Sequence, residues 1–344
     1  MTRTTPPRPA YVAAVLPQLA PLARTATRLH PRPGSPSARD SSVGGPLLWP
    51  VDEPWPYCDG PHLPDQVNPL LSLEDVRVRR RIMAAAAVRE GGGSRFTPEE
   101  SAVLARINEG RPLPASPLAM LPVAQLYVRD IPLLRLPGQA DLLQVLWCPF
   151  DHAPDPYPRT NLFWRTAAEV TDILSAAPEP AVVQFEGYVP EPCLLHPEQV
   201  TEYPHLMDLD EDLQALLEQW STWQTAGAAP DSYYEPAPQE FYRLELSTVP
   251  GWKVGGWPSW GVTDPVLVSC PACGTRMDPL LTIASNEWDA GTESWIPIED
   301  EAHAESGAYP DLRHPTMIQI GDEYSLQIYA CPASPDYPYA ELLQ

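Results

Sequence analysis

Apolar residues recur at helical spacing after two polar capping sequences in the first third of the chain. Ser72 with Asp75 three residues later predicts a capped helix start, and Thr97 with Glu100 predicts a second one. The apolar residues that share a face in these segments are Leu73, Val76, Met83, Ala87, Val103, Leu104 and Ile107. We therefore predict a pair of helices within 72–110.

Three further segments have helical patterns. Residues 10–29 predict a proline-interrupted helix, and residues 166–176 predict a short one. The strongest amphipathic pattern covers 208–225, and acidic residues crowd its start, where the helix dipole favours anions. Its apolar face consists of Leu209, Leu213, Leu216, Leu217 and Trp220.

Short apolar runs predict strands elsewhere in the chain. The predicted strands are 121–128, 142–148, 181–189, 241–247, 266–269, 279–284, 317–320 and 325–330. The 46 prolines among 344 residues agree with many short elements, because proline interrupts long helices. Since the strands are grouped and the helices are separated from them, we predict an α+β fold that is mainly antiparallel and β-rich, with helical insertions.

The same short motifs occur twice in the same order. Each set has a glycine pair, a cysteine-containing turn, an apolar strand and a strand that ends at Cys-Pro. The first set is Gly44–Gly45, Cys58, 122–126 and 142–149, and the second is Gly255–Gly256, 270–273, 279–283 and 325–332. Such self-similarity predicts one supersecondary unit that has been duplicated.

This repeat predicts the organisation of the chain, whose length allows about two domains. The predicted segments are 1–42, an N-terminal helix and loop; 43–150, a first repeat with a helical insertion at 72–110; 151–240, a connecting helical and strand segment; and 241–344, a second repeat with a Cys-x2-Cys turn.

The net charge of −23 restricts the classes of partner that the chain is expected to bind. It argues against nucleic acid, whose binding requires neutralisation of phosphates, and it suits a basic protein partner. Lys253 is the only lysine, and we interpret it as an ordinary exposed cation. No apolar run is long enough to span a membrane and no secretory signal is evident, so we expect a cytoplasmic protein without a membrane partner.

The six cysteines are therefore expected to be reduced thiols or metal ligands. Cys270 and Cys273 are two residues apart and are followed by glycine, a spacing typical of a zinc-binding turn, and Cys331 could supply a third thiolate. The alternative is a turn with reduced cysteines and no metal. Zinc, in a structural role, is thus a possible cofactor, and we assign no catalytic or other cofactor-binding residue.

A fourth ligand is not obvious from the sequence. Ser334 stands where a second Cys-x2-Cys pair would need its last cysteine. His314 or Cys58 could complete the site, and the spacing does not choose between them.

Together these motifs resemble the YwqG-like domain family of bacteria, and distantly the eukaryotic programmed cell death protein two family. The resemblance covers roughly 43–148 and 240–334, and it rests on their order. The segments that carry it are 44–50, 142–144, 253–260, the Cys270 and Cys273 turn, 279–281 and 325–331. The resemblance implies a protein-binding role, because the eukaryotic relatives hold a ribosomal protein during ribosome assembly and some bacterial members occur as immunity proteins. It implies no catalytic residue.

We therefore predict a non-enzymatic protein-binding module of a sequestering, immunity or chaperone type. It would act through its acidic surface or through a groove between the repeats. The alternative is a zinc-dependent hydrolase or nucleic-acid-processing enzyme that uses Cys270, Cys273 and Cys331.

Overall fold

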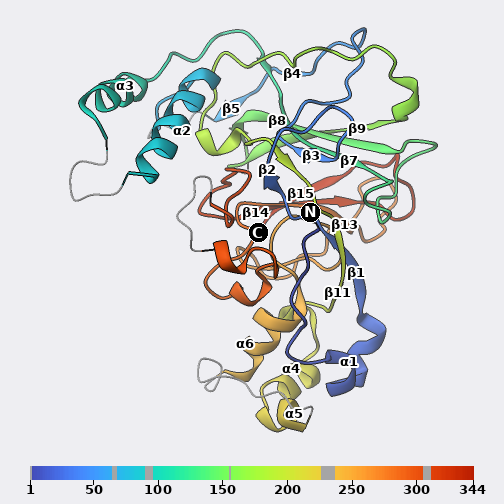
Figure 1. The fold of residues 1–344 in the computed structure, drawn as a ribbon. Helices are drawn as coiled ribbons and strands as arrows, with labels where there is room; N and C mark the ends of the chain where they lie inside the picture. Colours follow the sequence, from blue (N-terminus) through green and yellow to red (C-terminus); the bar gives the residue numbers. More distant parts are fainter. Residues whose placement is uncertain (1, 64–67, 90–95, 155, 226–236, 305–310) are drawn as a thin grey trace.

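The molecule consists of antiparallel sheets with helices at two ends (Figure 1). The computed structural model describes the chain except residues 1, 64–67, 90–95, 155, 226–236 and 305–310. The predicted α+β class with antiparallel sheets is confirmed. The α-helices are α1 (Val12–Val15), α2 (Leu73–Ala87), α3 (Pro98–Asn108), α4 (Glu211–Leu217), α5 (Trp220–Thr225) and α6 (Pro238–Tyr242). No helix in the described ranges is long and apolar enough to cross a membrane.

The two predicted capped helices, α2 and α3, are confirmed. The Ser72 hydroxyl accepts a hydrogen bond from the Asp75 amide, and the Asp75 carboxylate accepts one from the Ser72 amide. Thr97 and Glu100 form the same reciprocal pair at the start of α3. These caps satisfy backbone donors that have no partner in the first helical turn.

The predicted helix over 10–29 is wrong in its second half. Helix α1 is followed by the 3-10 turn η1 (Pro17–Leu22), and Arg24–Arg28 form strand β1. Pro17 and Pro21 shorten the helical part, because each lacks the amide donor that an α-helix needs. β1 is then held by strands on both sides.

Several other predicted elements are corrected. The strand predicted at 241–247 is helical, since α6 continues into the π-helical turn η5 (Arg243–Ser247) and Pro238 occupies the first helical position. The helix predicted over 208–225 is two helices, α4 and α5. The segments predicted at 166–176 and 181–189 contain the 3-10 turns η2 (Ala167–Glu169) and η3 (Glu186–Tyr188), together with isolated bridge residues at Ile173 and Val183. The strands predicted at 266–269 and 317–320 are isolated bridges.

Two large sheets and one small one contain the strands. The first sheet has the order β11 (Glu198–Glu202), β1, β12 (Lys253–Gly255), β13 (Asp278–Ala284), β14 (Ser325–Ala330) and β15 (Ala340–Leu343). The second has β2 (Arg32–Pro33), β10 (Cys193–Leu194), β3 (Ser42–Val43), β7 (Leu121–Tyr127), β8 (Leu142–His152) and β5 (His62–Leu63), with β9 (Pro158–Arg165) also paired to β8. The small one pairs β4 (Tyr57–Cys58) with β6 (Leu118–Ala119).

The ladders β3-β7-β8 and β12-β13-β14 have the same pairing register. Gln144 lies opposite Gln125 in one ladder, and Gln327 lies opposite Thr282 in the other. Both ladders have a register shift directly after a proline of the middle strand, between Pro122 and Ala124 and between Pro279 and Leu281. This agreement supports the predicted internal duplication, which stays a prediction.

A buried glutamine makes the same contact in both ladders. Gln144 Nε2 donates to the carbonyl of Leu48 at 3.0 Å, and Gln327 Nε2 donates to the carbonyl of Ser259 at 2.8 Å. Leu48 and Ser259 each lie four residues after the first glycine of a glycine pair. In both sheets the glutamine thus holds the loop that leaves the outer strand of its ladder.

The two large sheets share one apolar core. Side chains of both ladders belong to a single cluster, including Val123 and Val145 from one sheet and Leu281 and Ile328 from the other. A second cluster unites α1, η1, α4, α5 and α6 into a helical lobe, which is the lower part of Figure 1.

Lys253 is not the exposed cation that the sequence suggested. Its side chain is 1% exposed, and its Nζ lies 2.6 Å from Glu202 Oε1, a carboxylate that is fully buried. Glu202 also accepts backbone amides of Val249 at 2.8 Å and Trp257 at 2.6 Å. One carboxylate therefore joins β11, β12 and the loop after β12. Burial of this charge is tolerated because its oxygen atoms are hydrogen-bonded.

Replacement of Lys253 tests how strongly the stability of the fold depends on its ion pair with Glu202. We expect Lys253→Met to lower the free energy of unfolding by about 3–5 kcal/mol, because Glu202 would remain buried without its cation. The control is Arg77→Met, which removes a half-exposed ion pair with Glu179 and should cost under about 1 kcal/mol. Urea denaturation measures both variants, and equal losses would contradict a special role for Lys253.

The glycine beside this pair offers a second test. Gly256 has φ +76°, and a Cβ placed there would lie 2.0 Å from Glu202 Oε2. Gly138 also has a positive φ, of +57°, but nothing lies within 4 Å of its Cβ position. We expect Gly256→Ala to cost at least about 2 kcal/mol more than Gly138→Ala, because both are strained but only one collides with a buried group. Similar melting temperatures for the two variants would refute this.

Candidate metal centres

The structure brings together the three cysteines proposed from the sequence. Cys273 Sγ and Cys331 Sγ are 3.5 Å apart, and the sulfur atoms of Cys270, Cys273 and Cys331 all lie within 4.8 Å of one another. We call this group the three-cysteine cluster. The group could hold a metal ion.

Local backbone contacts place these thiols. The amide of Gly274 donates to the carbonyl of Cys270 at 2.8 Å, which closes the turn that carries Cys270 and Cys273. Cys331 directly follows β14. Cys270 and Cys331 are buried, whereas Cys273 is exposed. Hydrogen bonds with the side chain and then the backbone of Thr275 lower the pKa of Cys273 to about 7, which favours the thiolate that metals bind.

Neither suggested fourth ligand joins this cluster. His314 Nδ1 lies 3.1 Å from Asp311 Oδ1, and its Nε2 lies 3.7 Å from Glu323 Oε1. Cys58 belongs to a different group of donors. As far as the structure describes the chain, the three-cysteine cluster has no imidazole or carboxylate as a fourth member.

The second group was missed by the sequence analysis. Cys58, His62, Cys148 and His152 have their donor atoms within 4.8 Å of one another, and we call them the Cys2His2 cluster. Cys58 Sγ is 3.6 Å from His152 Nε2, and Cys148 Sγ is 3.3 Å from His62 Nε2. A signal was present in the sequence, because both halves of the cluster have the spacing Cys-x3-His.

Strand pairing assembles the Cys2His2 cluster. β5 pairs with the end of β8, so that His62 lies opposite His152. Cys148 and His152 are four residues apart on β8, in the stretch where the pairing with β9 shifts register between Trp147 and Asp151, and both donor atoms reach the cluster. Cys58 is delivered by β4, the strand just before β5.

The two thiols of this cluster shift each other's pKa in opposite directions. Hydrogen bonding from Cys148, assisted by His152, holds the pKa of Cys58 well below its usual value. The same contact with Cys58, together with burial, raises the pKa of Cys148. The thiol of Cys58 therefore loses its proton more readily than that of Cys148.

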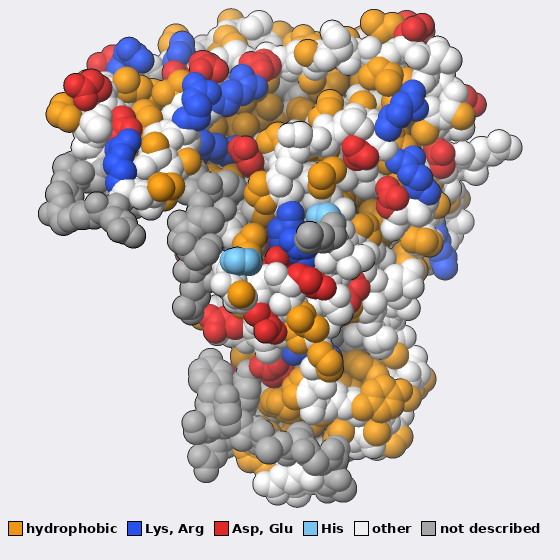
Figure 2. All heavy atoms as spheres, viewed as in Figure 1, with side chains coloured by type: hydrophobic (Ala, Val, Ile, Leu, Met, Phe, Trp, Pro, Cys, Tyr) orange, Lys and Arg blue, Asp and Glu red, His pale blue; other side chains and the backbone are white. Residues whose placement is uncertain are grey.

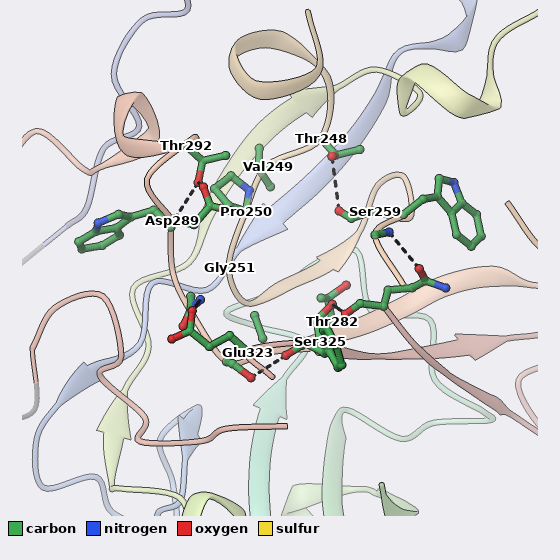
Figure 3. Close-up of a pocket in the computed structure, with 18 of the residues that line it drawn as sticks. Thr248, Val249, Pro250, Gly251, Ser259, Thr282, Asp289, Thr292, Glu323 and Ser325 are labelled. Carbon is green, nitrogen blue, oxygen red and sulfur yellow. Dashed lines mark hydrogen bonds between the residues drawn. The ribbon is translucent and has the colours of Figure 1, made fainter. Parts of the chain in front are cut away.

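The cavity in Figure 3 is lined by neither of the two donor clusters. It has a volume of about 220 Å³ and lies between the loop after η5 and the ends of β13 and β14. Its polar side chains bond to one another: Thr292 donates to Asp289 at 2.8 Å, and Ser259 donates to Thr248 at 3.4 Å. The volume is below the roughly 300–1,000 Å³ of ordinary small-molecule sites. We therefore place the candidate chemistry at the two donor clusters.

Searches against protein-family models and curated proteins find no match to this chain. The resemblance to the YwqG-like domain family thus stays a prediction that rests on the motifs quoted above.

A buried histidine in the cavity wall makes stability depend on pH. Burial, and then the nearby Arg243, lower the pKa of His205 to about 4. Because an unfolded histidine titrates near 6.5, the unfolded chain binds this proton first, and stability falls as the pH drops from about 6.5 to 4. His205 should account for about 2 kcal/mol of the stability lost between pH 7 and pH 5.

The variant His205→Asn isolates this contribution, since an amide oxygen can still accept the bond that His205 Nδ1 receives from the Met207 amide. Denaturant titrations of both proteins at pH 7 and 5 give the difference, and the other titrating groups cancel. Parallel pH profiles for the two proteins would contradict the assignment.

Proposed function

We propose that this chain is a non-enzymatic protein-binding module of the cytoplasm, of a sequestering, immunity or chaperone type. It would recognise a basic protein through its acidic surface, with a zinc ion held by Cys270, Cys273 and Cys331 as a structural element. The similar ladders are consistent with an internal duplication and with the YwqG-like resemblance.

The distribution of charge carries this proposal. The chain has 45 acidic and 22 basic residues, and most of the described basic side chains are already in ion pairs. In Figure 2, basic side chains on the upper part of the visible face lie beside acidic ones. The excess carboxylates remain for a partner, and their field would attract a positively charged protein and speed its association.

We place the binding surface on the outside and not between the ladders. The facing sides of the two sheets form one apolar core, so the space between them is filled by side chains. A partner could reach that region only by unfolding it.

The alternative, a zinc-dependent hydrolase, is favoured by one observation. A three-ligand site with an exposed member resembles catalytic zinc sites, which keep one position open for water. Such an enzyme also needs a group that moves the proton of that water. Because no described imidazole or carboxylate belongs to the three-cysteine cluster, the binding module is the better supported function.

Affinity isolation under two salt conditions tests the proposal. The tagged full-length chain should recover a basic protein in stoichiometric amount at about 50 mM salt and lose it at about 500 mM, because salt screens exposed charges. An unrelated protein of equal net charge is the control for non-specific capture. Recovery of no stoichiometric protein, or of one whose binding ignores salt, would refute this proposal.

Two variants with the same kind of change then locate the surface. One neutralises the exposed Glu211, Asp212 and Glu218 of the helical lobe, and the other neutralises the exposed Glu99 and Glu109 at α3. The variant on the binding surface should weaken capture and the other should not.

A further inference from the structure

We propose that Cys58, His62, Cys148 and His152 form a tetrahedral zinc site that is separate from the three-cysteine cluster. This inference goes beyond the protein-binding function and does not depend on it.

The distances between unlike donors match a single tetrahedral ion. Zinc–sulfur bonds of about 2.3 Å and zinc–nitrogen bonds of about 2.0–2.1 Å place sulfur and nitrogen about 3.5 Å apart in a tetrahedron. The two observed separations, 3.6 Å for Cys58 and His152 and 3.3 Å for Cys148 and His62, fall on either side of that value. The remaining separations stay within 4.8 Å. One ion can therefore contact all four donor atoms with little movement.

The donor set and its surroundings select zinc of the structural kind. Two thiolates and two imidazoles are a complete set of four, which leaves no position open for water. Cys148 is fully buried and His152 is 4% exposed, and Cys148 packs with Leu118, Phe150 and Val182. A hard cation such as Mg²⁺ or Ca²⁺ prefers oxygen ligands, and this group offers none.

The site lies where the fold needs a cross-link. The strands β4 and β5, which bring Cys58 and His62, have only two residues each. Strands this short contribute few ladder bonds, so they hold their segment weakly. A metal that joins them to the buried end of β8 would add binding free energy directly to folding.

The two ladders also place the two clusters at corresponding positions. Cys148 lies four residues after Gln144, and Cys331 lies four residues after Gln327, the two glutamines that make the same loop contact. His152 follows Cys148 by four residues, where the other ladder has Pro335. The cluster beside the first ladder therefore combines thiols with imidazoles, and the cluster beside the second contains thiols alone.

Cobalt substitution in a variant without the three-cysteine cluster tests the proposal. The full chain with Cys270, Cys273 and Cys331 all changed to Ser should bind one Zn²⁺ by elemental analysis. After exchange, Co²⁺ should show the intense visible bands of tetrahedral geometry and a charge-transfer intensity that corresponds to two thiolates. In this background, Cys58→Ser should weaken Co²⁺ binding by more than about 100-fold, since loss of an outer-shell partner alone costs about 10–100-fold.

Two controls keep the test decisive. Cys193→Ser removes a buried thiol outside both clusters and should leave Co²⁺ binding unchanged. Circular dichroism shows whether each variant folds, and zinc should protect the half-buried Cys58 from alkylation in the protein with all its native cysteines. Absence of bound metal from the folded background variant, or an octahedral cobalt spectrum, would overturn the proposal. Neither result would bear on capture of a basic protein.

Discussion

The hydrogen bond from a buried glutamine to the loop beyond a glycine pair fixes the geometry of each ladder. Gln144 and Gln327 occupy the same register position in their ladders. The side-chain amide of each donates to the carbonyl of a loop residue that lies outside the strands. Because side chains alternate between the faces of a strand, a slip of one residue would turn this amide away from its loop and move core residues to the opposite face. Four positions after each glutamine is a cysteine of a donor cluster: Cys148 lies within β8, and Cys331 directly follows β14.

Buried polar side chains hydrogen-bond to loop backbone at several places in this molecule. Glu202 gathers the ammonium of Lys253 and the amides of Val249 and Trp257 around one buried carboxylate. The close approach is possible because Gly256 has no side chain. A chain with 46 prolines loses many backbone donors and forms short strands, so its loops must be held by side chains instead of ladder bonds.

The elements that were predicted correctly from the sequence are those that depend on contacts between residues close together in the chain. The capping boxes at Ser72 and Thr97 lie within four residues of chain, and they gave the starts of α2 and α3 correctly. Strands β7, β8, β13 and β14 were also predicted, because their apolar runs are continuous. The error at 241–247 has a tertiary cause: its apolar residues suit a strand or a helix equally, and packing against α4 and η1 favours the helix.

The candidate site was only half predictable for a similar reason. The short spacing of Cys270 and Cys273 indicates a metal-binding turn from the sequence alone. Cys58 and His152, by contrast, are 94 positions apart and come together only because β5 pairs with the end of β8. The burial of Lys253 likewise depends on Glu202, which lies 51 positions away. Spacing within the chain could have suggested the pair of Cys-x3-His motifs, but only the strand pairing shows that they face each other.

The two donor clusters differ in the number of positions that they would leave open on a bound metal ion. When four protein ligands surround a metal ion, no coordination position remains for another molecule. Such an ion therefore serves to hold the short strands in place. A three-thiol group with an exposed Cys273 retains a free position on the surface. In a reducing compartment metal ions could perform this cross-linking where disulfides do not persist.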